Sequence, residues 1–256
     1  LCKGLCERIG MESSMITHEA NGNKATTPAI FPTHTEAFAE VVKKMTTGEG
    51  KVIDSMEEIN AVGHRVLHGS EKYKVSTLVT DQVIEDIFAF RDLGPLHNPP
   101  QATAMKACQE VFGKDTPMVA VFDTSFHQTM PEKAYMFPIP YEYYEKYSIR
   151  RYGFHGTSHR FISGRYTELT GRKDRLIVCH LGNGSSITAV KDGKCLDTSM
   201  GLTPLDGFIM GTRCGGIDPS IVTFLMNKEG LTADEMSDIM NKKSGFLGVS
   251  GISSDC

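Results

Sequence analysis

The segment HLGNGSS, residues 180–186, combines residue types that could hold an anion. It follows the apolar run RLIVC, which has the composition of a buried strand, and it contains two glycines and two serines. Glycine lets a ligand approach the main chain closely, and successive main-chain N–H groups in a turn form a concave anion site. We predict a phosphate-contacting turn here. An ordinary strand, turn and hairpin would also use these glycines, so the motif alone leaves both interpretations open.

An arginine and an aspartate extend this chemistry. Arg65 lies in the predicted strand of GHRVLHG, where a buried guanidinium would form either a structural salt bridge or a fork for a carboxylate or phosphate. Asp123 ends the apolar strand of AVFDTSFH. In open α/β sheets the carboxyl ends of strands line the ligand crevice, so Asp123 could hold Mg²⁺, take a proton, or cap a turn.

Two further motifs supply a histidine and a second arginine. His155 and His159 in YGFHGTSH have a spacing that can bind zinc on a helix, but no glutamate stands beside the first histidine. We expect His155 to donate to a phosphoryl oxygen instead. Arg213 lies among the glycines of MGTRCGGIDPS, where it could reach a ligand or remain an exposed loop residue. Cations, donors and an acid around a Gly-rich turn are the set that phosphoryl transfer needs.

The composition narrows the class of protein. The chain has 256 residues, a formal net charge of -4, 40% hydrophobic residues and 23% charged residues, which is typical of a soluble globular protein. The charge argues against nucleic acid as a partner, and no apolar stretch is long enough to span a membrane. Seven cysteines without a CxxC pair predict neither a zinc site nor a disulfide framework, and a reducing cytoplasm is the expected compartment.

Helix and strand signals alternate along the chain. Capping, periodicity and stop signals predict helices over residues 33–45, 81–94, 98–113, 157–169 and 219–230, and another from Thr232. Strands are predicted around residues 59–69 and 118–126, with a hairpin over 185–200 that turns at Asp192-Gly193. This order indicates an α/β fold, and the hairpin indicates a mixed sheet. A boundary is expected in the Pro- and Tyr-rich stretch 130–148, and both chain ends suggest a fragment.

Seven motifs together resemble the acetate kinase family. They cover nearly the whole chain in order and read GHRVLHGSEKY, LGPLHNPP, AVFDTSFHQTMP, RRYGFHGTSH, HLGNGSSITAV, DTSMGLTPLDGFIMGTRCGGIDP and NKKSGFLGVSGISSD. The resemblance implies a two-lobed actin-like ATPase (ribonuclease H-like) α/β fold with mixed sheets, incomplete at both ends. Residues 1–125 would be the N-terminal lobe on the acyl-substrate side, and residues 126–256 the C-terminal lobe on the nucleotide side. The implied reaction is reversible, Mg²⁺-dependent phosphoryl transfer between ATP and acetate, giving acetyl phosphate and ADP.

The resemblance also assigns roles to single residues. Asp123 resembles the catalytic acid/base, His155 and Arg213 the residues that stabilise the transition state, and Arg65 the substrate-binding arginine. The apolar pocket for the acyl methyl group would comprise Leu67, Leu96, Phe154 and Pro204. The nucleotide phosphate turn would comprise His180, Leu181, Gly182, Asn183 and Gly184, with Asp255 beginning a second nucleotide-binding segment. Asp123 is the one candidate metal ligand.

The sequence also departs from the family pattern, and alternatives remain. Nothing matches the family's N-terminal phosphate loop, its adenosine loop or its metal-binding glutamate, so the chain alone is expected to be inactive although the full-length enzyme, a homodimer by resemblance, is active. A propionate or butyrate kinase would share these motifs, because one methylene changes only apolar contacts. A nucleotide-binding module of the actin and Hsp70 type would share the glycine turn but would not need Arg65, His155 and Arg213 to converge.

Overall fold

The computed structural model describes residues 2–95 and 97–255, which form two compact units. Unit 1 comprises Leu1–Val66 and Thr77–Ala120, and unit 2 comprises Leu67–Ser76 and Val121–Cys256. The described strands form three sheets of three strands each. The lobe boundary expected near residue 125 stays a prediction.

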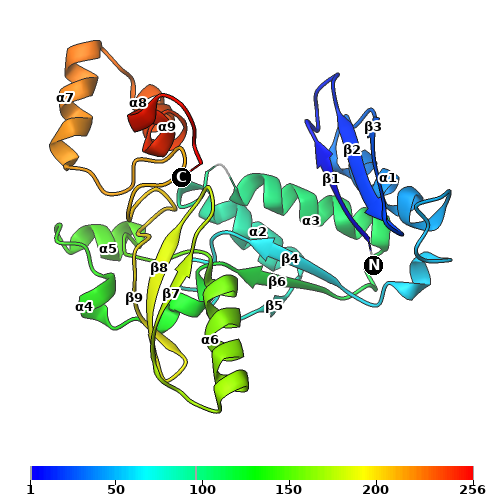
Figure 1. Cartoon of the computed structure of the whole chain (residues 1–256), viewed down its shortest axis with the longest axis horizontal. Coiled ribbons are helices and arrows are strands. Elements are labelled where there is room, and N and C mark those ends of the chain that lie inside the picture. The colour runs from blue at the N-terminus through cyan, green and yellow to red at the C-terminus, as the bar shows by residue number, and fades with distance from the viewer. Residues whose placement is uncertain (1, 96, 256) are drawn as a thin grey trace. The chain divides into compact units, whose positions relative to one another are not determined.

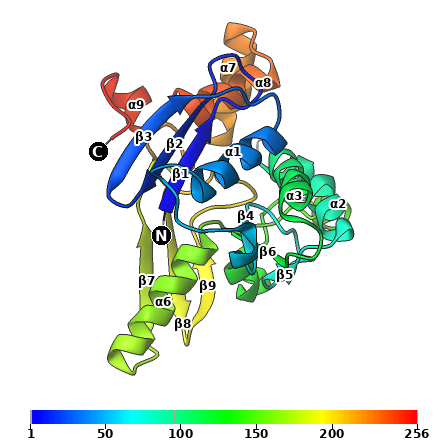
Figure 2. The same ribbon diagram turned by 90° about the vertical axis from the view of Figure 1, so that its right-hand side faces the viewer.

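An antiparallel sheet opens unit 1. It consists of β1 (Cys2–Glu7), β2 (Met15–Ala20) and β3 (Asn23–Pro28), and the β2–β3 turn at Asn21 and Gly22 has positive φ at both residues. Such a turn matches the right-handed twist of the two strands. The sequence analysis missed this sheet, although Asn-Gly between two strands is a strong hairpin signal. Figures 1 and 2 show α1 beside the sheet, and Ile16, Phe31 and Ala37 form the core here.

Three helices of unit 1 pack side by side. These are α1 (His34–Thr46), α2 (Asp81–Ala89) and α3 (Asn98–Phe112), and α3 contacts both of the others. The capping box of Thr33 and Glu36 at the start of α1 is confirmed, as is the end of α3 at Gly113. The α-helix predicted to run from Asp81 to near Gly94 is shorter, because the 3₁₀ turn η2 (Phe90–Asp92) follows Ala89. A second 3₁₀ turn, η1 (Met56–Glu58), precedes the next strand.

The second sheet carries the chain from unit 1 into unit 2. Its strands are β4 (Val62–Val66), β6 (Met118–Phe122) and β5 (Thr77–Leu78) in that order, and β5 runs antiparallel to β6. Met118, Ala120 and Phe122 are buried on one side of β6, which confirms the predicted strand. Asp123 follows directly, and η3 (Ser125–Thr129) comes next.

The third sheet lies wholly in unit 2. Its strands β7 (Arg175–His180), β8 (Ser186–Lys191) and β9 (Lys194–Thr198) are antiparallel, and the hairpin turning at Asp192 and Gly193 is confirmed. Figures 1 and 2 show α6 (Gly156–Thr170) against this sheet. In β8, Ser186, Thr188 and Val190 are buried.

Shorter helices complete unit 2. They are α4 (Glu132–Tyr135), α5 (Glu142–Tyr147), α7 (Pro219–Glu229), α8 (Ala233–Lys242) and α9 (Gly245–Ser250). The predicted Asp218 cap of α7 and the predicted capping box of α8 are confirmed. Among the residues described, no helix combines the length and the apolar character needed to cross a membrane.

Candidate active site in unit 2

The glycine turn is a closed loop between two paired strand ends. His180 at the end of β7 pairs in register with Ser186 at the start of β8. Within the loop, the Ser185 hydroxyl accepts a hydrogen bond from the N–H of Gly182 at 3.2 Å and donates to the Gly182 carbonyl at 2.8 Å. Ser185 therefore holds the loop shape from inside, while Gly182 and Asn183 remain exposed.

This turn forms one side of a pocket of about 450 Å³ in unit 2. Its lining residues are Leu181, Gly182, Asn183, Ser185, Phe208, Ile209, Gly211, Phe246, Ser254 and Asp255. The two segments assigned to the nucleotide by resemblance, the turn and Asp255, therefore meet at one pocket. Main-chain N–H groups on one side and aromatic rings on the other suit a ligand with an anionic and a flat apolar part.

The loop before Arg213 is fastened on two sides. The N–H groups of Phe246 and Leu247, in the first turn of α9, donate to the carbonyls of Met210 and Gly211 at 2.9 and 3.0 Å. The Gly211 N–H in turn donates to the Asn183 carbonyl at 3.2 Å. The first two bonds satisfy two of the orphan donors at the start of α9, and the third holds the loop against the glycine turn.

Arg213 and His155 meet at Gly184. A Cβ atom added at Gly184 would lie 3.0 Å from Nη1 of Arg213 and 3.6 Å from Nε2 of His155. Arg213 Nη1 also donates to the Pro204 carbonyl at 3.2 Å. Burial lowers the pKa of Arg213, but a guanidinium remains a cation at neutral pH. A cation and an imidazole therefore face the same glycine of the turn.

The main chain of Asp123 lies beside His155. Its carbonyl accepts a hydrogen bond at 3.0 Å from Gly156, the first residue of α6, and only glycine fits there because a Cβ would collide with that carbonyl. His155 itself caps α6 with φ of 58°, a left-handed conformation that is uncommon outside glycine. The structure thus brings Asp123, His155 and Arg213 into one region of unit 2, and their catalytic roles stay predictions.

A histidine cluster surrounds the ring of His155. Ser186 Oγ lies 2.9 Å from Nδ1 of His155 and 2.7 Å from Nε2 of His159. The His180 ring stacks on His155 with centroids 4.1 Å apart, and its Nδ1 lies 2.9 Å from Ser158 Oγ. Sequence reasoning used His159 only to weigh a zinc site and missed Ser186. A second serine after the turn was the available signal, but its partners come from a helix that is distant in sequence.

The predicted acyl pocket is only partly described. Leu67 and Phe154 belong to one buried cluster with Met200 and Met210, and the carbonyl of Pro204 contacts Arg213 as stated above. Leu67 is 6% exposed and Phe154 is inaccessible, so both are core residues here. Leu96 lies outside the described residues. The binding role of these residues stays a prediction.

The expectation that Arg65 is buried is wrong. In β4, Val62, His64 and Val66 are at least partly buried, whereas Gly63 and Arg65 are exposed. Successive side chains of a strand point to opposite faces, so the apolar neighbours of Arg65 do not bury it. Arg65 belongs to unit 1, and its substrate-binding role stays a prediction.

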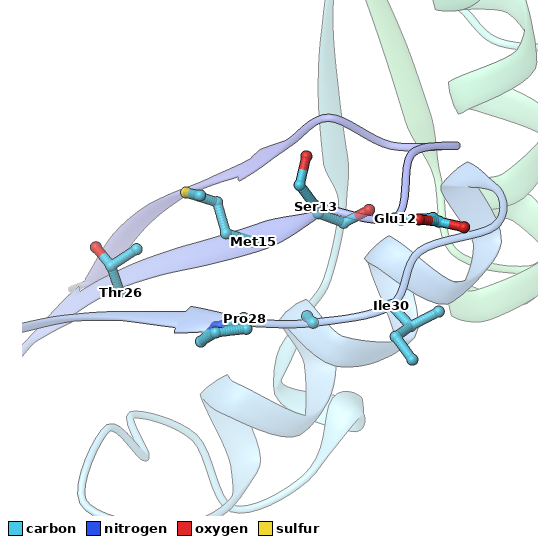
Figure 3. Close-up of a pocket in the computed structure, with 8 residues that line it drawn as sticks. Glu12, Ser13, Met15, Thr26, Pro28 and Ile30 are labelled. Atoms are coloured by element: carbon cyan, nitrogen blue, oxygen red, sulfur yellow. The ribbon is translucent and has the colours of Figure 1, made fainter.

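Unit 1 holds a separate, larger pocket of about 620 Å³ (Figure 3). It is lined by Glu12, Ser13, Ser14, Met15, Thr26, Pro28, Ala29 and Ile30. These lining residues include one carboxylate and no basic side chain. The lining of the unit 2 pocket has no basic side chain either, but Nη1 of Arg213 lies beside Gly184 of the glycine turn that forms one side of it. The glycine-turn pocket of unit 2 is therefore the better candidate.

The side chains described form no cluster of three or more metal ligands. Mg²⁺ does not require such a cluster, since it is commonly held by one or two carboxylates together with substrate phosphates. Asp123, 1% exposed at the end of β6, is a carboxylate of that kind. The residues present thus fit a magnesium ion that arrives with a nucleotide.

Comparisons with known proteins identify relatives of the whole chain. The acetate kinase of Caldanaerobacter subterraneus subsp. tengcongensis is 57% identical over 259 residues, covering 100% of this chain and 64% of that protein. The acetate kinase of Methanosarcina barkeri is 55% identical over 259 residues, with 100% and 63% covered. This chain therefore spans about 64% of the length of such relatives.

Solved structures confirm the expected α/β fold with mixed sheets, which is that of an actin-like ATPase. The chain superposes on Porphyromonas gingivalis acetate kinase with a TM-score of 0.94 at 45% identity, covering 100% of this chain and 65% of that one. For a propionate kinase from Francisella tularensis the TM-score is 0.92 at 41% identity, with the same coverage. The model of the acetokinase family matches residues 1–256. The chain belongs to the acetokinase family.

Proposed function

We propose that the protein containing this chain transfers a phosphoryl group reversibly between ATP and acetate, giving ADP and acetyl phosphate. The observation that carries the proposal is the meeting of Arg213 and His155 at Gly184, within a turn that also lines the nucleotide-sized pocket. The relatives from Caldanaerobacter subterraneus subsp. tengcongensis and Methanosarcina barkeri, which are acetate kinases, support the same reaction.

The proposed mechanism is direct in-line transfer. The transferring group passes through a loose, metaphosphate-like state whose charge is spread over its equatorial oxygens, so the protein's main task is to position and neutralise. Arg213 supplies a guanidinium and His155 an N–H donor to those oxygens. The glycine turn holds the remaining nucleotide phosphates through its main chain.

The acceptor side needs a carboxylate site and an apolar wall. Arg65 would pair with the carboxylate of acetate, and Leu67, Leu96, Phe154 and Pro204 would enclose the methyl group. Asp123 would orient the attacking oxygen or hold Mg²⁺. When bound, Mg²⁺ would neutralise phosphate charge.

Propionate is the second candidate substrate, because a propionate kinase shares the fold at 41% identity. One added methylene in an apolar pocket changes the transition-state free energy by about 1–3 kcal/mol, so one active site can accept both acids. Butyrate would add a second methylene. A nucleotide-binding module without transfer chemistry is less favoured, because it has no use for Arg213 and His155 beside the turn.

The test is an assay of the natural full-length protein that contains this chain, with acetate, propionate or butyrate, ATP and Mg²⁺. Acyl phosphate is trapped by hydroxylamine, and kcat/KM is measured for each acid. We expect acetate to give the highest value and residues 1–256 alone to give no turnover. Absence of acyl phosphate with all three acids would overturn the proposal. A cytoplasmic location and a homodimer are further parts of this proposal, to be checked by cell fractionation and by light scattering.

A further inference from the structure

The hydroxyl of Ser186 lies between two imidazole rings with different surroundings. His155 is half-buried and faces Gly184, whereas His159 is inaccessible to solvent. Nδ1 of His159 is buried and has no hydrogen-bond partner among the described residues. Its Nε2 contacts Ser186 Oγ, so a ring proton on Nε2 can form a hydrogen bond within the described structure and one on Nδ1 cannot. This asymmetry determines the direction of the hydrogen bonds.

His159 is a neutral imidazole, because burial, with a smaller contribution from His180, lowers its pKa to about 4. A neutral ring carries one proton. On Nδ1 that proton would form a buried N–H without an acceptor, and such orphaned donors are rarer than under-used acceptors. The proton therefore belongs on Nε2, from which it is donated to Ser186 Oγ over 2.7 Å.

Ser186 has a single hydroxyl proton to pass on. Having accepted from His159, its oxygen can donate to Nδ1 of His155, 2.9 Å away. An Nδ1 that accepts a hydrogen bond carries no proton, so the ring proton of His155 lies on Nε2. That atom belongs to the ring edge that faces Gly184. Consecutive hydrogen bonds of this kind also strengthen one another.

We propose that Ser186 and His159 are positioning residues that hold His155 in the tautomer with its N–H directed at the glycine turn. We call this chain of hydrogen bonds, from His159 through Ser186 to His155, the relay, and no proton is transferred along it. It ensures that His155 presents a donor, rather than a lone pair, to an anionic group at Gly184. The proposal rests on the proposed function in one respect, namely that His155 acts on a phosphoryl oxygen.

The first experiment reads the tautomer directly. The natural protein, labelled with ¹⁵N in histidine, is studied by long-range ¹H–¹⁵N correlation, which distinguishes protonated from bare ring nitrogens. We expect His155 to be protonated at Nε2 and bare at Nδ1. In Ser186→Ala the donor to Nδ1 is lost, and the two ring nitrogens should move toward averaged values. Protonation of His155 at Nδ1 in the unsubstituted protein, or no change in Ser186→Ala, would overturn the proposal.

The second experiment separates positioning from packing. In Ser186→Ala and His159→Phe we expect kcat to fall roughly tenfold to hundredfold with little change in KM, because a donor to the transition state is no longer held in place. His159→Gln places an amide N–H near the former Nε2 and should retain more of kcat than His159→Phe. The matched control is Ser163→Ala, which removes an equally buried hydroxyl bonded to the main-chain carbonyl of His159.

We expect Ser163→Ala to keep both kcat and the His155 signals. Equal loss of kcat in Ser163→Ala and Ser186→Ala would contradict a specific relay. If the protein forms no acyl phosphate at all, the proposed function fails, whereas the ¹⁵N signals of His155 still decide whether the relay exists.

Discussion

The main-chain N–H of Gly211 donates to the carbonyl oxygen of Asn183, which joins the loop of Arg213 to the glycine turn. Position 211 has no room for a residue larger than glycine. A Cβ on Gly211 would collide with the side-chain oxygen of Asn183 and lie 2.9 Å from the carbonyl of Ser254. Two of the segments that line the pocket, the glycine turn and the loop before Arg213, are therefore in direct main-chain contact.

Gly211→Ala should weaken nucleotide binding. The added methyl group must displace the Asn183 amide or the Ser254 carbonyl, and both belong to residues that line the pocket. We expect the KM for ATP to rise roughly tenfold, equivalent to about 1.4 kcal/mol of lost binding. Initial rates at varied ATP measure it. An unchanged KM for ATP would show that the pocket does not bind the nucleotide.

Arg213→Ala should lower kcat by roughly a thousandfold, because it removes a cation from the transferring phosphoryl group. The effect on stability should be small, since Arg213 is half-buried and its guanidinium donates to the Pro204 carbonyl at 3.2 Å. The control is Arg165→Ala, which breaks only an exposed ion pair with Glu168. Full activity at saturating substrates in Arg213→Ala would remove Arg213 from the mechanism.

Acid should destabilise unit 2 before it protonates most carboxylates. Burial lowers the pKa of His68 and His127 to about 3, and that of His159 to about 4, from 6.5. The unfolded chain then binds more protons than the folded one, so this stability is complete above pH 6.5 and is lost as the pH falls toward those values.

By about pH 5, proton binding by the unfolded chain at each of these three histidines should lower the free energy of unfolding by on the order of 2 kcal/mol. Urea midpoints measured between about pH 7.5 and pH 5 check this, and His159→Gln should lose less stability over the same range because it has one fewer buried group to protonate. A midpoint independent of pH in this window would contradict the neutral, buried state of these rings.

Gly164→Ala should stabilise the protein by about 0.5–1 kcal/mol, since alanine in a helix interior costs less conformational entropy than glycine. Gly164 is exposed within α6, and a Cβ there meets no atom within 4 Å. The melting temperature should therefore rise while kcat and KM stay unchanged. A lower melting temperature would contradict this prediction.

Local signals predicted the elements better than the site. Thr33 with Glu36, and Thr232 with Glu235, fix helix starts through bonds three residues apart, so the sequence alone locates them. The β1–β2–β3 sheet was missed because its strands are largely polar, and its Asn21-Gly22 turn was overlooked.

Prediction was weakest for side-chain exposure and for contacts that depend on the tertiary structure. The exposure of Arg65 follows from which side of β4 is covered, which its apolar neighbours do not reveal. The Ser186 contacts join β8 to a helix 27 and 31 residues away, a distance over which no sequence spacing rule operates. By contrast, the glycines of the turn and the Arg213 loop were found because close approach demands glycine itself.

The left-handed backbone conformation of His155 lowers the stability of the fold at a residue that is proposed to take part in phosphoryl transfer. A non-glycine residue in this conformation costs about 1–2 kcal/mol, and the imidazole does not remove that cost. Glycine at position 155 should therefore yield a more stable fold than alanine, the reverse of their order within a helix. Histidine at this position therefore keeps a backbone cost that glycine would avoid, and the chain bears that cost at the residue on which phosphoryl transfer is proposed to depend.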